Sequence, residues 1–169
     1  MVVLRATKRV LRQLPSSNPV SGDGDTALGD WYVNRFVVDR KPLLILVSSS
    51  SLLAILTPAR DVRSLPTRLC TLVAGRLERL GASARLVRRE ISVMEPVQLA
   101  PTRDRSVLGV MVEASRAVAY YLPEREWGEA ELFAAEAQLA QTPCYASRPT
   151  KEVVFPELAA PELLAARWS

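Results

Sequence analysis

The longest stretch of the chain without a charged residue, at 42–59, constrains the fold more than any other feature. It reads PLLILVSSSSLLAILTPA, which approaches the length of a membrane-spanning helix but carries four serines at its centre and a proline at each side. Two short apolar runs, at 43–47 and 52–57, flank the serines and predict two strands joined by a turn. We therefore expect no membrane-spanning segment here.

The residues before this stretch extend the pair of strands to three. WYVNRFVV at 31–38 is rich in aromatic and β-branched residues, and DRKP at 39–42 has the composition of a turn. The spacing is that of hairpins, which predicts an antiparallel meander over 31–57. Because LLILV at 43–47 is apolar at every residue, we expect its strand to be buried on both faces and central in the sheet.

After Asp61 the apolar residues recur every three or four positions, which predicts helices. These lie near 61–80, 83–94, 105–122 and 127–141, with further strands at 1–6, 97–100 and 151–155 and a last helix at 161–168. We expect the hydroxyl of Thr7 to cap a helix that follows the first strand. The predicted fold class is α+β, with an antiparallel sheet of about 4–6 strands backed by helices.

Length and composition predict one globular domain over 1–169, because 49% of the 169 residues are hydrophobic and 24% are charged. Residues 15–30 are rich in Gly, Pro, Ser and Asp and predict a flexible loop. Residues 156–169 predict a C-terminal segment that docks onto the core.

The cysteines and the N-terminus favour a cytoplasmic location. Cys70 and Cys144 are distant thiols in a chain large enough to need no disulfide, which is typical of a reducing compartment. Basic residues interrupt the apolar N-terminal residues, so no secretion signal is predicted. The first acid is Asp23, which leaves an organelle transit peptide as the alternative.

Composition also excludes several kinds of chemistry. The chain has no histidine, which excludes Ser-His-Asp and Cys-His nucleophiles and a His-ligated zinc, and two isolated cysteines do not form a zinc site. The G-x-G-x-x-G and G-x-S-x-G motifs and a P-loop lysine are missing. GDGD at 22–25 lacks the ligand series of a calcium loop, and the glutamates at 123–131 fit a helix start. We therefore predict no catalytic residue, metal or cofactor, and favour binding over catalysis.

Charge is distributed unevenly along the chain. Residues 1–20 carry four bases and no acid, 58–95 carry eight arginines, and 111–169 carry nine acids against five bases. On the first two long helices we place five arginines opposite the apolar stripes, as candidate nucleic-acid-binding residues: Arg68, Arg76, Arg79, Arg85 and Arg89. The alternative is a solvated polar face, and no aromatic residue in 58–95 offers a platform for unpaired bases.

The segment PTRDRSVLGVMVEA at 101–114 offers a second candidate site. Its hydroxyls and guanidinium groups would lie at a helix N-terminus, where free backbone N–H groups favour an anion. The candidate anion-binding residues are Thr102, Arg103, Arg105 and Ser106. In the alternative interpretation Asp104 or Thr102 is only the N-cap, and Gly109 is a small residue that lets the helix approach the sheet.

Three pieces of the chain, in order, carry a family resemblance. They are VLRATKRVLRQL at the N-terminus, W-x-x-N at 31–34 with its D-R-K hairpin, and T-x-x-R-S-V-L-G-x-M at 102–111. Together they resemble a bacterial family of uncharacterised domains of unknown function that share W-x-x-N and T-x-(N/D)-R-S-x-x-G-x-M motifs. The family pattern has asparagine where Asp104 and Val112 stand, so this chain lacks a polar role at 112. The resemblance implies a compact intracellular bacterial domain and brings no reaction, cofactor or catalytic residue.

Three functions stay open. The leading hypothesis is a non-catalytic interaction domain, whose partner is another protein or a second copy, contacted through Leu164 and Trp168, unless these dock on the chain's own core. The second is nucleic-acid binding through the helical arginines. The third is an enzyme or sensor that binds an anionic small molecule at 102–109.

Overall fold

The computed structural model describes residues 1–18, 20, 22–124, 126–145 and 153–169. Its five-stranded sheet has the order β4-β3-β2-β1-β5. The strands are β1 (Val2–Ala6), β2 (Trp31–Val38), β3 (Lys41–Ser48), β4 (Ala54–Pro58) and β5 (Val97–Pro101). The helices are α1 (Lys8–Leu11), η1 (Val62–Ser64, a 3-10 turn), α2 (Leu65–Arg79), α3 (Ala84–Ser92), α4 (Arg105–Tyr121), α5 (Glu129–Gln141) and α6 (Pro156–Trp168).

The predicted α+β class and the meander are confirmed. β2, β3 and β4 pair antiparallel in sequence order, and β3 lies inside the sheet with residues 43–48 buried. A two-residue turn joins β2 to β3, and its residues Asp39 and Arg40 have φ of 48° and 66°. Positive φ at both positions is the geometry of the turn that matches the twist of paired strands.

The expectation of a purely antiparallel sheet is wrong, because the sheet is mixed. β1 pairs parallel with both β2 and β5. Parallel neighbours need a long connection that returns the chain to the same end of the sheet. α1 and the loop at 15–30 provide it between β1 and β2, and α2 with α3 provides it before β5. Hairpins therefore join only the three meander strands.

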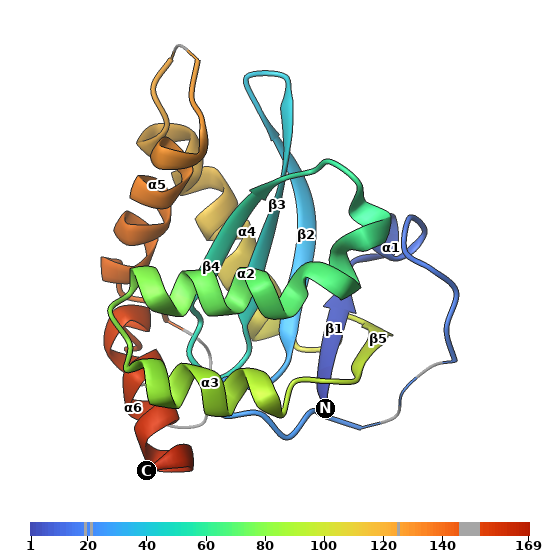
Figure 1. Ribbon diagram of the computed structural model, residues 1–169. Coiled ribbons are helices and arrows are strands. Elements are labelled where there is room, and N and C mark those ends of the chain that lie inside the picture. The colour runs from blue at the N-terminus through green and yellow to red at the C-terminus, as the bar shows by residue number, and fades with distance from the viewer. Residues whose placement is uncertain (19, 21, 125, 146–152) are drawn as a thin grey trace.

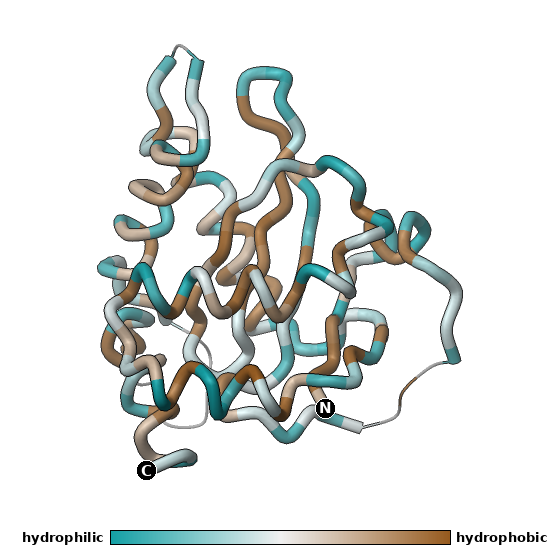
Figure 2. Tube along the Cα trace, viewed as in Figure 1, coloured by the Kyte–Doolittle hydropathy of each residue, from teal (hydrophilic) through white to brown (hydrophobic). Residues whose placement is uncertain are grey.

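Helices cover both faces of the sheet (Figure 1). Leu44 and Leu46 of β3 pack into a core formed with α1, α2, α3 and α6, whereas Leu43, Ile45 and Val47 pack into a core formed with α4 and α5. This division explains why β3 is apolar at every residue. Figure 2 shows the same arrangement, with hydrophobic residues along the central strands.

Several predicted details need correction. Thr7 is the N-cap residue of α1, but its hydroxyl makes no capping hydrogen bond and instead donates to Asn34 Oδ1 at 3.0 Å. The long helix after Asp61 begins at Leu65, behind η1, and ends before Gly81, whose φ of 83° suits a glycine. The last helix begins at Pro156 rather than 161. Of the strand predicted at 151–155, residues 151–152 lie outside the described residues, and Val154 forms an isolated antiparallel bridge with Cys144.

Glu90 of α3 joins two segments that are far apart in sequence. Its fully buried carboxylate accepts hydrogen bonds from the N–H groups of Ala27 at 2.9 Å and Leu28 at 3.0 Å. It also accepts one from the Trp168 indole at 2.7 Å. α6 packs against α3 and α5, and Leu164 is fully buried. None of the described helices is long and apolar enough to cross a membrane.

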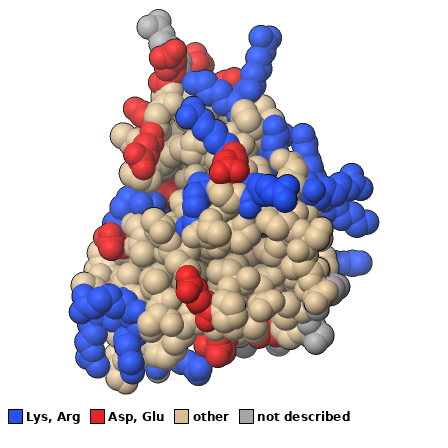
Figure 3. Space-filling model, turned by 45° about the vertical axis from the view of Figure 1, so that its right-hand side comes forward, with Lys and Arg blue, Asp and Glu red and all other residues tan. Residues whose placement is uncertain are grey.

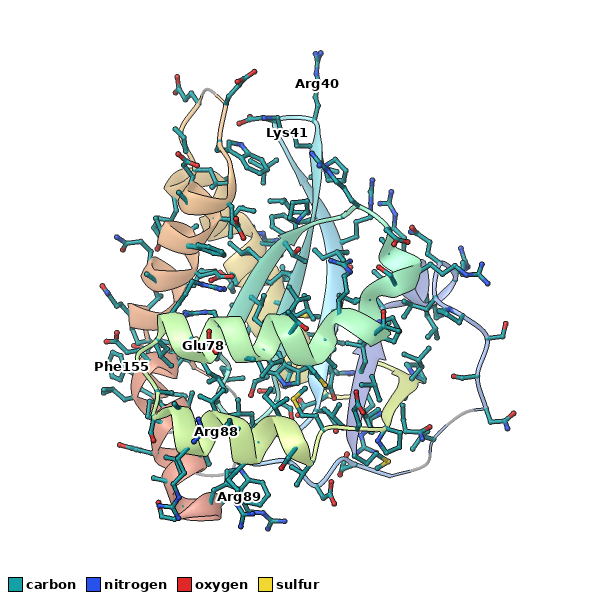
Figure 4. All side chains as sticks on the ribbon, viewed as in Figure 1. Arg40, Lys41, Glu78, Arg88, Arg89 and Phe155 are labelled. Carbon is teal, nitrogen blue, oxygen red and sulfur yellow. The ribbon has the colours of Figure 1, made fainter. Side chains whose placement is uncertain are left out.

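We expect Glu90→Ala to lower the free energy of unfolding by at least about 3 kcal/mol, because three donors lose a charged acceptor in the interior. Urea denaturation of the full chain measures it. Glu78→Ala on the exposed side of α2 is the matched control and should change stability by less than about 0.5 kcal/mol (Figure 4). Equal stability of the two variants would contradict the role given to Glu90.

Candidate functional site

The segment at 102–106 connects the end of β5 to the start of α4. Asp104 is the N-cap of α4, and its Oδ1 accepts from the N–H groups of Ser106 at 2.8 Å and Val107 at 3.4 Å. The backbone N–H of Asp104 donates to the hydroxyl of Tyr32 at 3.2 Å. The protein's own carboxylate thus occupies the first-turn amides that an anion would use.

The structure does not bring the four predicted anion-binding residues together. Arg103 forms an ion pair with Asp23. Arg105 and Ser106 instead line a separate hollow of about 590 Å³ along α4, and the Ser106 hydroxyl has no hydrogen-bond partner in the described part of the chain. Thr102 extends the pairing of β5 with β1, because its N–H donates to Ala6 O at 3.3 Å.

The expected close approach of α4 to the sheet at Gly109 is wrong. A Cβ at this position would meet no atom within 4 Å, and the residue is exposed. Gly109 lines the same hollow as Arg105. Its small size leaves that hollow open rather than letting the helix pack more closely.

A buried ion pair lies beside this segment, and it is not predicted by the sequence analysis. Arg5 Nε donates to Asp30 Oδ2 at 2.8 Å, and the two side chains are 3% and 5% exposed. Arg5 also donates to Gly22 O at 2.9 Å, and Asp30 accepts from the N–H of Gly24 at 2.8 Å. The signal was an arginine within the otherwise apolar strand VVLRA.

Above this pair lies a polar hollow of about 430 Å³, lined by Asp30, Tyr32, Arg103 and Asp104 among others. Burial raises the pKa of Tyr32, so its hydroxyl is held protonated. The hydrogen bonds of this region tie the loop at 22–30 to β1 and to the start of α4. The polar groups of this hollow therefore hold the loop in place.

The five helical arginines do not form one surface. Arg85 and Arg89 are exposed on α3. Arg68 bonds locally, through Nε to Ser64 Oγ at 2.9 Å. The expectation that Arg76 lies opposite the apolar stripe is wrong, because its side chain is only 3% exposed. At 100° per residue Arg76 lies about 20° from Leu65 around the helix, which is within the stripe itself.

Arg76 and Arg79 both bind Glu136, a fully buried residue of α5. Arg79 Nη2 lies 2.9 Å and Arg76 Nε 3.5 Å from Glu136 Oε2. Burial raises the pKa of Glu136 and lowers the pKa of Arg76. The charge of each residue opposes the pKa shift of its partner. The sequence signal for Glu136 was a glutamate beside Ala135 on the apolar side of its helix.

Arg76 and Glu136 also cover the free edge of β4. Arg76 Nε donates to Ala54 O at 3.0 Å, and Leu56 N–H donates to Glu136 Oε1 at 3.0 Å. These backbone groups point away from β3 and would otherwise pair with another strand. Arg76 and Glu136 therefore protect the edge of the sheet, and Arg79 supports Glu136.

Eight other cations lie on another part of the surface, which we call the basic face. It comprises the exposed or half-exposed bases of α1, of β2 with its turn to β3, and of the β4–η1 connection: Lys8, Arg9, Arg12, Arg35, Arg40, Lys41, Arg60 and Arg63. Their acidic neighbours in these segments are Asp39 and Asp61. α1 and η1 pack on the same core, and Figure 3 shows basic side chains along the upper and right-hand parts of this side.

The basic face and the α3 arginines lie apart. Figure 4 shows Arg40 and Lys41 at the tip of the hairpin, with Arg88 and Arg89 at the opposite end of the molecule. Arg85, Arg88 and Arg89 occupy one exposed side of α3. The structure thus presents two separate groups of cations rather than a continuous band.

We expect Asp104→Ala to destabilise the protein by about 1 kcal/mol, because α4 loses its N-cap. Asp104→Ser, which keeps a capping oxygen, should recover most of that stability. Arg103→Ala removes only an exposed ion pair and should cost less than about 1 kcal/mol, compared in the same urea titration. A larger loss for Arg103→Ala than for Asp104→Ala would contradict this assignment.

Glu136→Leu should destabilise the protein by about 3–5 kcal/mol, because it leaves the buried Arg76 charge without its partner. The double variant Arg76→Met, Glu136→Leu should lose clearly less than the sum of the two single variants. A thermodynamic cycle from chemical denaturation measures this coupling. Additive losses would show that the two groups are stabilised independently.

Comparison with curated proteins and with solved structures gives no match. The resemblance to a family of domains of unknown function is confirmed, while the W-x-x-N and T-x-(N/D)-R-S-x-x-G-x-M motifs stay a prediction. A family model described as a domain of unknown function (DUF6933) matches residues 3–158, and the chain therefore belongs to that family.

Proposed function

We propose that this protein is a binding domain for nucleic acid and that it contacts the phosphate backbone through the basic face. The observation that carries the proposal is the charge of that face: eight bases stand against Asp39 and Asp61, in a chain whose formal net charge is +4. The rest of the chain therefore carries more acids than bases. An excess of cations on one side is the electrostatic footprint of a polyanion partner.

The geometry of the face supports this choice. Its cations come from a short helix, a hairpin turn and a 3-10 turn, and those of α1 and η1 are exposed. In the described part of the chain, none of the eight forms an ion pair with a carboxylate. The guanidinium and ammonium groups can therefore turn toward phosphates without breaking an internal pair.

The proposal moves the predicted nucleic-acid site from α2 and α3 to the basic face. Arg76 and Arg79 bind Glu136, so neither guanidinium charge is free to neutralise a phosphate. Arg68 lies next to the basic face, since its Nη2 donates to Arg60 O at 3.3 Å. Arg85 and Arg89 form the competing surface, which the experiment below distinguishes.

The test is fluorescence anisotropy with a labelled duplex DNA of about 20 base pairs, titrated at several salt concentrations. We expect affinity to fall linearly with salt on logarithmic axes. Arg9→Gln, Arg12→Gln, Arg63→Gln should weaken binding and reduce the slope by about 0.9 for each phosphate that the variant no longer neutralises.

The control Arg88→Gln, Arg116→Gln, Arg167→Gln removes the same charge from elsewhere and should keep the slope. Affinity that falls with Arg85→Gln, Arg89→Gln but not with the α1–η1 variant would move the site to α3 and refute the basic face. Absence of binding at low salt would refute nucleic-acid binding altogether.

A further inference from the structure

A groove beside the basic face combines aromatic and cationic side chains. It has a volume of about 790 Å³ and lies between the start of β3, the end of β4, helix α2 and the start of α5. Trp127 and Phe133 line it together with Lys41, Arg60 and Arg79. Lys41 and Arg60 also belong to the basic face, so the groove continues that surface.

The cations lie against the aromatic rings. Lys41 Nζ is 4.8 Å from the centroid of the Trp127 ring, and Arg79 Cζ is 3.7 Å from that of Phe133. The described residues include no carboxylate partner for Lys41, so its ammonium group can leave the indole for a phosphate. Arg79 is held by Glu136 and stays in place, where its planar guanidinium group offers a further stacking surface.

An extended peptide does not fit this groove as an added strand. The edge of β4 that faces it is already used, since Ala54 O accepts from Arg76 and Leu56 N–H donates to Glu136. The next residue along this edge, Pro58, has no N–H to donate. Strand addition needs an uninterrupted row of free N–H and C=O groups, and these contacts together with Pro58 interrupt that row.

The chemistry of the groove fits an unpaired nucleobase. Aromatic rings and guanidinium planes stack on bases of any sequence, and cations at the rim hold the adjoining phosphates. A duplex keeps its bases stacked inside and cannot present them. Glu129 also lines the groove and repels phosphate, which favours the uncharged base on that side.

We infer that the groove of Trp127 and Phe133 receives an unpaired base, so that the protein prefers single-stranded to duplex nucleic acid. This inference rests on the proposed function, since phosphates on the basic face lead the strand to the groove. The chain segment 58–95 contains no aromatic residue. The fold supplies the missing platform from the residues around the start of α5.

The experiment compares two labelled probes, a single strand of about 20 deoxythymidines and a duplex of the same length, by anisotropy with the full chain. We expect the single strand to bind more tightly. Trp127→Leu should weaken single-strand binding at least about fivefold, because one base no longer has an indole to stack on, and leave duplex binding within about twofold. The single strand should also quench tryptophan emission in the parent chain but not in this variant.

Tyr120→Leu is the matched control, because it removes an aromatic side chain that is 88% exposed on α4, away from the groove. It should change neither affinity, and circular dichroism checks that each variant is folded. Phe133→Leu should also weaken single-strand binding selectively, because it removes the ring against which the Arg79 guanidinium group lies.

Equal or tighter binding of the duplex, or an equal loss of both affinities in Trp127→Leu, would refute base binding in the groove. It would not refute phosphate binding by the basic face. Failure of both probes to bind in a salt-dependent way would overturn the proposed function and the inference together.

Discussion

The fully buried carboxylate of Glu136, with its two guanidinium partners, is the interaction on which the arrangement of the elements depends. Attraction between buried charges does not by itself recover the cost of taking them out of water. Here Arg76 and Glu136 also satisfy the backbone of β4, at Ala54 O and Leu56 N–H. Among the described residues the sheet therefore ends at β4, and α5 lies along the edge that would otherwise be open.

A buried carboxylate and a buried ion pair hold the long connection that the parallel pairing requires. The loop at 15–30 has few large apolar residues, so burial of side chains alone gives it little support. Glu90 holds it at Ala27 and Leu28, and Arg5 with Asp30 holds it at Gly22 and Gly24. Within it Gly29 has a φ of 74°, and a Cβ there would lie 2.4 Å from Ser49 Oγ, so only glycine fits.

The sequence predicted those features that depend on neighbouring residues. The meander, the helices after Asp61 and the Asp104 cap all follow from period, turn composition or local capping. The parallel pairing of β1 could not be predicted, because it depends on contacts between distant segments. Of the candidate site, the sequence shows each arginine but not its partners: the contacts of Arg76 with Ala54 of β4 and Glu136 of α5 join segments that are far apart in the chain. The angle of Arg76 from Leu65 around the helix was the signal that could have placed it inside the apolar stripe.

The separation of buried from exposed cations allows binding to be tested without loss of the fold. Arginines that reach the interior, such as Arg5 and Arg76, are used for structure. The elements that carry the basic face are anchored instead by apolar residues, with Val10 in α1 and Val62 in η1 packed into the core. Replacing an exposed cation on these elements leaves its anchor in place, so that a loss of affinity there reports on the surface charge and not on unfolding.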